Sequence, residues 1–133
     1  MAVFHSSSVE ETIAWAKQFA ETLQTGDVVL LQGEMGAGKT HIAKGIALGL
    51  GILEEVTSPT YAYINSYDDR LFHFDCYRIS SEEQAEQLGF SDYFDMGGIC
   101  LVEWSENIAG LLPPDCKIVE LIKTGEEERE IRF

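Results

Sequence analysis

Eight consecutive residues of this chain have the types and the spacing needed to hold a triphosphate. The stretch 33–40 matches the pattern G-x-x-x-x-G-K-[ST] at every fixed position. Its glycines let the main chain approach an anion closely, so that N–H groups point at the phosphates. The ammonium of Lys39 would hold the β- and γ-phosphates, and the hydroxyl of Thr40 would bind Mg²⁺. We expect a nucleoside triphosphate to lie along Met35, Gly36, Ala37, Gly38, Lys39, Thr40 and His41.

The segments on either side of this loop fit a strand and a helix. Residues 28–32 form a short apolar run that begins with two valines, as expected of a buried strand. Residues 41–50 repeat apolar side chains at helical spacing, at Ile42, Ile46 and Leu50. Strand, loop and helix therefore follow one another in the order that the phosphate-binding motif requires.

Two further apolar runs end in a carboxylate. Phosphoryl transfer or hydrolysis needs an acidic residue at the end of a neighbouring strand to hold the Mg²⁺ shell. Asp75 ends the run 71–75 and Glu103 ends the run 99–103, so both are candidate catalytic residues. Glu103 could hold the metal, directly or through water, or it could polarise the attacking water. Asp75 is the competing ligand, and either carboxylate could instead face solvent at a strand end.

A histidine lies two residues before Asp75. Strand alternation would put His73, Asp75 and Tyr77 on one face. A lone histidine there is more often a hydrogen-bonded structural residue than a catalyst. We expect no zinc site, because no second histidine or cysteine lies at ligand spacing.

A hydroxyl-rich loop with a proline follows the second helix. Many nucleotide hydrolases place at this point a segment that responds to the γ-phosphate, and here Ser58 and Thr60 would do so. The alternative is a plain turn that leads into the strand expected over 61–67.

The rest of the chain alternates between helical and strand patterns, which indicates a single α/β domain over residues 1–133. Ser8 and Glu11 have capping-box spacing and predict the start of a helix. We expect helices over 9–20, 81–88, 90–96 and 105–112, and strands over 61–67, 71–75, 99–104, 116–122 and 128–133. This order predicts a three-layer fold like that of P-loop nucleotide hydrolases, with a mostly parallel central sheet and antiparallel strands at the C-terminal end.

Composition restricts the partners and the compartment. The 133 residues carry a net charge of −14, with 23 acidic and 9 basic side chains. Such a surface repels phosphates, so we expect no strong direct binding of nucleic acid. It would suit a protein with a basic face, or it simply maintains solubility. No apolar run approaches the ~18 residues that span a membrane. The three cysteines are odd in number and scattered along the chain, as expected of free thiols in a reducing cytoplasm.

What the chain lacks narrows the reaction class. A small-molecule kinase of this type closes an arginine-bearing lid over the phosphates, and no insertion here is long enough to form one. The Asn-Lys-x-Asp signature that reads guanine is also absent, so ATP is favoured over GTP.

Four landmarks, taken together and in order, resemble the TsaE family of bacterial P-loop ATPases. They are the phosphate loop 33–40, Ser-Pro-Thr-Tyr at 58–61, His-Phe-Asp-Cys-Tyr-Arg at 73–78 and Leu-Val-Glu-Trp at 101–104. The resemblance covers nearly the whole chain, although His41 stands where the family often has a second threonine. It implies a role in making threonylcarbamoyladenosine on transfer RNA, together with TsaD-like and TsaB-like proteins. ATP hydrolysis would reset their complex between turnovers.

The resemblance also assigns roles to single residues. Lys39 and Thr40 match the phosphate and Mg²⁺ positions, and Glu103 matches the acidic residue assigned near the metal. Asp75 matches a position important for hydrolysis or coupling. Trp104 would lie close to the nucleotide, or else in the core.

Two further matches lie near the ends of the chain. Ser8 and Thr12 resemble the family's segment at the edge of the nucleotide. Arg129 resembles a C-terminal arginine that reaches the nucleotide, although pairing with its neighbouring glutamates fits the sequence equally well.

We therefore expect a slow Mg²⁺-dependent ATPase. Two rival hypotheses are a small-molecule kinase with a hydroxyl substrate and a nucleotide-dependent binding module without useful turnover.

Overall fold

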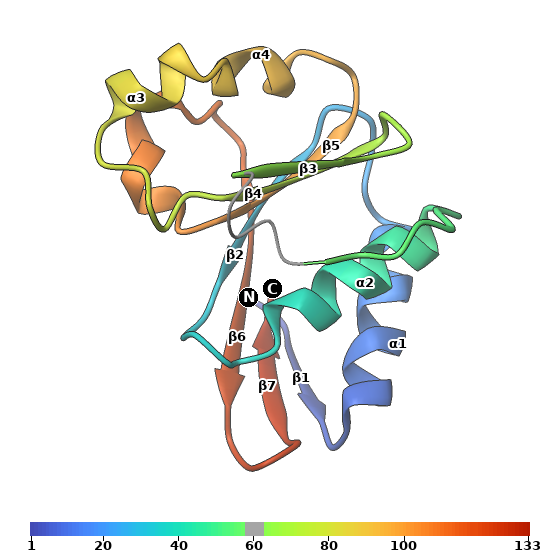
Figure 1. Ribbon diagram of the computed structural model, residues 1–133. Coiled ribbons are helices and arrows are strands. Elements are labelled where there is room, and N and C mark those ends of the chain that lie inside the picture. The colour runs from blue at the N-terminus through green and yellow to red at the C-terminus, as the bar shows by residue number, and fades with distance from the viewer. Residues whose placement is uncertain (58–62) are drawn as a thin grey trace. The chain divides into compact units, whose positions relative to one another are not determined.

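The computed structural model describes residues 1–57 and 63–133, which alternate between strands and helices. Ser58 and Thr60, expected to respond to the γ-phosphate, lie outside the described residues. In chain order the elements are β1 (Val3–Ser6), α1 (Val9–Ala20), β2 (Val28–Gln32), α2 (Lys39–Gly49), β3 (Ile64–Tyr67), β4 (Leu71–Asp75), α3 (Glu82–Gln87), α4 (Phe90–Phe94), β5 (Ile99–Glu103), the 3₁₀ helix η1 (Ser105–Leu111), β6 (Lys117–Lys123) and β7 (Arg129–Arg132) (Figure 1).

The strands form a seven-stranded mixed sheet in the order β1-β7-β6-β2-β5-β4-β3. Strands β4 and β5 are parallel, whereas β3–β4, β6–β7 and β1–β7 are antiparallel pairs. The expected α/β class with antiparallel strands at the C-terminal end is confirmed. Strand β1 was not expected, because its four residues carry too short an alternation to be read locally. It forms by pairing with β7, from Val3 opposite Arg132 to Ser6 opposite Arg129.

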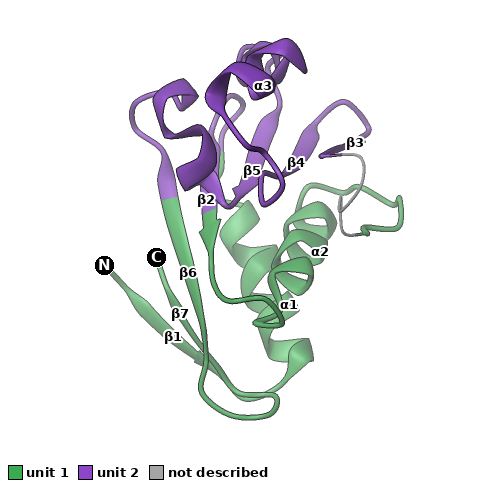
Figure 2. Ribbon diagram, turned by 60° about the vertical axis from the view of Figure 1, so that its left-hand side comes forward, with its two compact units in different colours: residues 1–23, 31–57, 118–133 green, residues 24–30, 58–117 purple. Residues whose placement is uncertain are grey.

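The chain divides into two compact units (Figure 2). Unit 1 comprises Met1–Leu23, Leu31–Thr57 and Ile118–Phe133, and therefore contains the phosphate loop with helices α1 and α2. Unit 2 comprises Gln24–Leu30 and Ser58–Lys117, and therefore contains strands β3, β4 and β5 with helices α3 and α4. Among the described residues, no helix combines the length and apolar character needed to cross a membrane.

In unit 1, helices α1 and α2 lie side by side (Figures 1 and 2). The Ser8 side chain caps α1 by accepting from the Glu11 N–H at 3.1 Å, as the capping-box spacing predicts. Glycine lets the two helices approach closely. A Cβ atom built on Gly45 would lie 2.5 Å from both the Cβ atom of Ala16 and the carbonyl oxygen of Ile13.

In unit 2, the two faces of the β4–β5 pair differ. Phe72 and Phe74 of β4 and Val102 of β5 belong to a buried apolar cluster. The Phe74 ring contacts the rings of Phe90 and Phe94 of α4, with centroids 5.4 Å apart in each case. Because side chains alternate along a strand, the residues between these apolar ones point to the opposite face. On that opposite face, His73, Asp75 and Glu103 lie beside the buried side chains of Leu71 and Leu101.

The three cysteines are free thiols. Cys76 and Cys100 are buried in unit 2, and burial raises the pKa of each thiol to about 12. The carboxylates of Asp75, Glu103 and Glu106 also raise the pKa of Cys76. Both side chains therefore behave as small apolar groups at neutral pH.

We predict that Gly45→Ala destabilises unit 1. The added methyl group has no space against α1, and overpacking of this kind costs about 1–3 kcal/mol. The better helix propensity of alanine returns only about 1 kcal/mol, so we expect the free energy of unfolding to fall. Chemical denaturation measures this change. The control Lys44→Ala lies on the exposed side of the same helix and should change stability by less than ~0.5 kcal/mol. Equal stability of the two variants would contradict the packing described here.

Candidate functional site

The phosphate loop of unit 1 leads directly from β2 into the first turn of α2. Gly36 and Gly38 have φ angles of 84° and 101°, which side chains disfavour. Gly38 is the N-cap of α2, and no side chain among the described residues caps the helix there. A helix that begins with uncapped N–H groups at a glycine loop provides hydrogen-bond donors and a positive dipole end for an anion. The motif therefore adopts the conformation that its sequence predicts.

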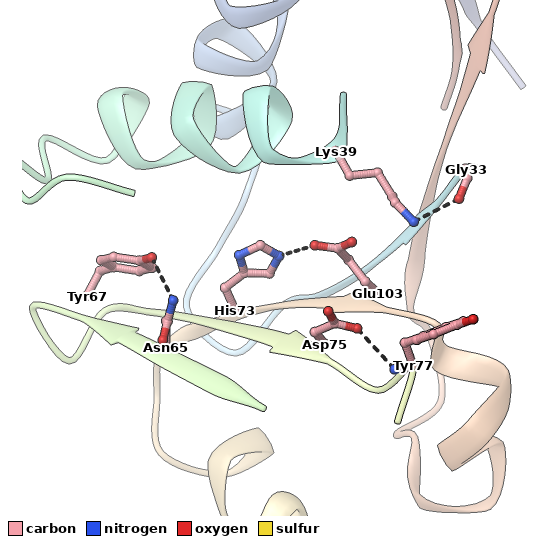
Figure 3. Close-up of polar contacts among 8 residues, drawn as sticks. All are labelled: Gly33, Lys39, Asn65, Tyr67, His73, Asp75, Tyr77 and Glu103. Atoms are coloured by element: carbon pink, nitrogen blue, oxygen red, sulfur yellow. Dashed lines mark hydrogen bonds and ion pairs between the residues drawn. The ribbon is translucent and has the colours of Figure 1, made fainter. Parts of the chain in front are cut away.

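Lys39 folds back over this loop. Its side chain donates from Nζ to the Gly33 carbonyl oxygen at 2.8 Å (Figure 3). The residue is only 8% exposed, so its ammonium group is held at the loop and does not extend into solvent. A positive charge is thus in place beside the main-chain donors.

Arg129 of β7 joins the phosphate loop to the β6–β7 turn. Its Nε donates to the Ala37 carbonyl oxygen at 2.6 Å. Its Nη1 donates to the carbonyl oxygens of Gly125, Glu126 and Glu128, at 3.1, 3.2 and 2.8 Å respectively. These partners are main-chain carbonyl groups and not the glutamate side chains that the sequence offered as an alternative to the nucleotide. Arg129 therefore ties the Ala37 carbonyl of the loop to the β6–β7 turn.

Four other predicted nucleotide-binding residues, Thr12, Ala37, Gly38 and His41, line a cavity together with Arg129 in unit 1. A small cavity of about 10 Å³ is lined by Val9, Thr12, Ala37, Gly38, His41, Glu127 and Arg129. Thr12 is buried, and its hydroxyl pairs with that of Ser6 at 2.7 Å. Ser8 does not line this cavity. The structure therefore brings Thr12 and His41 to the loop and uses Ser8 as a helix cap.

A larger cavity of about 220 Å³ was not anticipated from the sequence. It is lined by Gly33, Glu34, Glu120, Leu121, Ile122 and Lys123. Strand β6 passes so close to the loop that a Cβ atom on Gly33 would lie 2.8 Å from the Leu121 carbonyl oxygen. No local signal marks this proximity, because the two segments are far apart in the sequence.

The two candidate carboxylates lie at matching positions in unit 2. Asp75 is paired with Glu103 in the register of β4 and β5, so both side chains leave the carboxyl ends of adjacent parallel strands. Glu103 is 7% exposed. Asp75 is less buried, and its Oδ1 accepts from the Tyr77 N–H at 3.0 Å.

Glu103 has a buried histidine partner. The Nε2 atom of His73 lies 2.5 Å from Oε2 of Glu103 (Figure 3). Alternation explains the contact, because His73 and Asp75 share a face of β4 and Asp75 is the register partner of Glu103. Strand alternation predicted the face on which each side chain lies. It did not give the register between strands about thirty residues apart, so this pair was not foreseen.

Trp104 follows Glu103 directly and begins η1 with φ 56° and ψ 44°, a left-handed conformation unusual for a large side chain. Its ring lies 5.0 Å from the Tyr77 ring, centroid to centroid. Backbone strain of this kind is retained where the surrounding structure requires it, often at a functional site.

Each unit carries an oxygen donor of the kind that magnesium binds. Mg²⁺ binds oxygen ligands and is usually held by one or two protein groups together with phosphate and water. The hydroxyl of Thr40 and the carboxylate of Glu103 are ligands of this type. Thr40 belongs to unit 1, as do the other phosphate-loop residues, whereas Glu103 and Asp75 belong to unit 2.

Comparisons with known proteins all match this chain to members of one family. Residues 6–131 match the family model described as threonylcarbamoyl adenosine biosynthesis protein TsaE. The tRNA threonylcarbamoyladenosine biosynthesis protein TsaE of Bacillus subtilis is 45% identical over 127 residues, covering 93% of this chain and 79% of that protein. The protein of the same description from Treponema pallidum is 40% identical over 128 residues, covering 95% of each chain.

A solved structure has the same fold as this chain. The crystal structure of Bacillus subtilis YdiB superposes with a TM-score of 0.82 at 38% sequence identity. The match covers 98% of this chain and 82% of that one. With a family model matching nearly its whole length and relatives well above 30% identity, this chain belongs to the TsaE family.

Proposed function

We propose that this protein binds ATP at the phosphate loop and hydrolyses it slowly, as an accessory protein of threonylcarbamoyladenosine formation on transfer RNA. The observation that carries the hydrolase part is the loop itself. Its two left-handed glycines, its uncapped helix start and the folded Lys39 side chain form an anion site of the type that binds triphosphates. The pathway rests on membership of the TsaE family.

Each residue of the proposed site has a defined task. Main-chain N–H groups of the loop orient the β- and γ-phosphates, and Lys39 stabilises the charge that develops on them. The Thr40 hydroxyl and the Glu103 carboxylate would hold Mg²⁺, which would neutralise phosphate charge when bound. Trp104, Thr12, His41 and Arg129 surround the bound nucleotide.

Hydrolysis breaks the bond between the γ-phosphorus and the oxygen that bridges to the β-phosphate. A water molecule attacks in line, and the products are ADP and inorganic phosphate. Glu103 orients this water or the metal shell, and Asp75 contributes to coupling. Turnover by the chain alone is slow, because the Arg129 guanidinium is already committed to main-chain carbonyl groups and a partner must supply or order the missing charge.

The proposed partners are TsaD-like and TsaB-like proteins in the bacterial cytoplasm. The net charge of −14 supports docking onto protein surfaces with a basic face rather than onto RNA. In this arrangement the partners carry the transfer chemistry and contact the transfer RNA, and ATP hydrolysis resets the complex between turnovers.

We predict that Lys39→Ala abolishes useful ATP turnover. Loss of the ammonium removes a stabilising charge from the transition state, and removal of one such donor costs about 100- to 1,000-fold in rate. Steady-state phosphate release and nucleotide binding by calorimetry measure the two effects. Lys44→Ala, with an exposed lysine on the same helix, should match the wild-type protein. Unchanged turnover of Lys39→Ala would show that the nucleotide is processed elsewhere.

Glu103→Ala separates a hydrolase from a nucleotide-dependent binding module. If Glu103 orients water or metal, its loss should lower kcat about 100-fold or more, whereas partner affinity should persist. A pure binding module would keep its partner affinity and would have no hydrolysis to lose. Single-turnover assays with radiolabelled ATP distinguish the two results.

We also predict that the partner proteins change the ATPase. TsaD and TsaB from the same organism should raise the turnover rate or alter the nucleotide affinity of the purified chain. Lys39→Ala serves as the control for contaminating ATPases. If the mixture shows neither binding nor a change in rate, the assigned pathway is wrong, and a metabolite screen would then test the small-molecule kinase alternative.

A further inference from the structure

We propose that His73 is a positioning residue for ATP hydrolysis, in which its Nε2–H group holds the Glu103 carboxylate in the orientation that the reaction uses. The inference rests on the proposed function and adds to it a residue that does not itself touch the nucleotide. The argument uses only unit 2, where His73 and Glu103 lie on adjacent parallel strands.

The strands fix both side chains at their backbones. His73 lies in the middle of β4, paired with Leu101, and Glu103 is the last residue of β5. The opposite face of the same strands packs against α4 through Phe72 and Phe74. The backbones that carry the histidine and the glutamate are therefore held by a buried core, and little freedom remains beyond side-chain rotation.

A hydrogen bond from His73 restricts that remaining freedom. Glu103 is 7% exposed and ends in a carboxylate that rotates about three side-chain bonds. The bond from Nε2 of His73 to Oε2 at 2.5 Å selects one rotamer and one plane for the carboxylate. A catalytic carboxylate performs well only when neighbours lock it within a narrow range of orientations.

The other ring nitrogen argues against a purely structural role. His73 is fully buried, and its Nδ1 has no hydrogen-bond partner among the described residues. An unpaired buried polar atom destabilises the fold, and an apolar ring of similar size would fill the space without that cost. Among the described residues, the bond to Glu103 is the one hydrogen bond of the His73 ring, and it explains the polar side chain.

The experiment compares two substitutions of His73. His73→Phe fills the space but has no donor, whereas His73→Gln retains an N–H group that can reach Glu103. His5→Gln, an exposed histidine of β1, is the matched control. We expect His73→Phe to lower kcat about 10- to 100-fold with the KM for ATP unchanged. We expect His73→Gln to recover most of the loss, and His5→Gln to behave as wild type.

A double-mutant cycle tests whether His73 acts through Glu103. In the Glu103→Ala background, His73→Phe should cause little further loss of kcat. Independent, multiplying losses would overturn the proposal. Equal loss of kcat in His73→Phe and His73→Gln, matched by a lower Tm in both, would also overturn it, because that pattern indicates a structural role.

Nuclear magnetic resonance of the histidine rings gives a readout that does not depend on activity or on the stability of a His73 variant. In the wild-type protein, we expect the His73 ring to carry its proton on Nε2. The hydrogen bond to the carboxylate should shift the signal of this proton downfield. Glu103→Ala should remove this shift and leave the His5 signals unchanged. If the His73 ring signal has the same chemical shift in Glu103→Ala as in the wild-type protein, the inference is overturned. Absence of ATP turnover in the wild-type protein would instead refute the proposed function, while the ring signal still decides whether the contact exists.

Discussion

The proposed chemistry depends on the tight turn by which the chain passes from β2 into α2. In this turn the main-chain N–H groups must face the inside of the loop. Two glycines in left-handed conformations make the turn sterically possible. Two side chains then hold it. Lys39, from within the loop, donates to the carbonyl oxygen of Gly33, and Arg129 of β7 donates to the carbonyl oxygen of Ala37. A site built mainly from backbone atoms needs such support, because no side chain of its own defines its shape.

The second half of the proposed site is built from a side chain, and that side chain needs a partner. A carboxylate at the end of β5 is almost fully buried, and burial without a partner is costly. His73 supplies a partner, while its own Nδ1 has none within residues 1–57 and 63–133. The other face of β4 packs against α4 through Phe72 and Phe74, and buried Leu71 and Leu101 flank the polar pair on its own face. Trp104, in a strained left-handed conformation directly after Glu103, continues this pattern.

Local features were predictable from the sequence, and features that join distant segments were not. The phosphate loop, the helix cap at Ser8 and the apolar runs of β2, β4 and β5 are encoded within a few residues. Strand β1 exists only by pairing with β7 at the far end of the chain. Neighbouring glutamates suggested side-chain partners for Arg129, yet one of its actual partners, the carbonyl of Ala37, is 92 residues away. The contact between His73 and Glu103 likewise depends on inter-strand register, which alternation alone does not reveal.

The most direct test of this account is a crystal structure of the protein with Mg²⁺ and a non-hydrolysable ATP analogue. The account predicts that the phosphates lie against the N–H groups of residues 36–40 and that Lys39 leaves the Gly33 carbonyl to bind them. It also predicts that Glu103, still bonded to Nε2 of His73, contacts the metal shell or the attacking water. A triphosphate bound away from the loop, or a Glu103 carboxylate directed away from the metal, would contradict it.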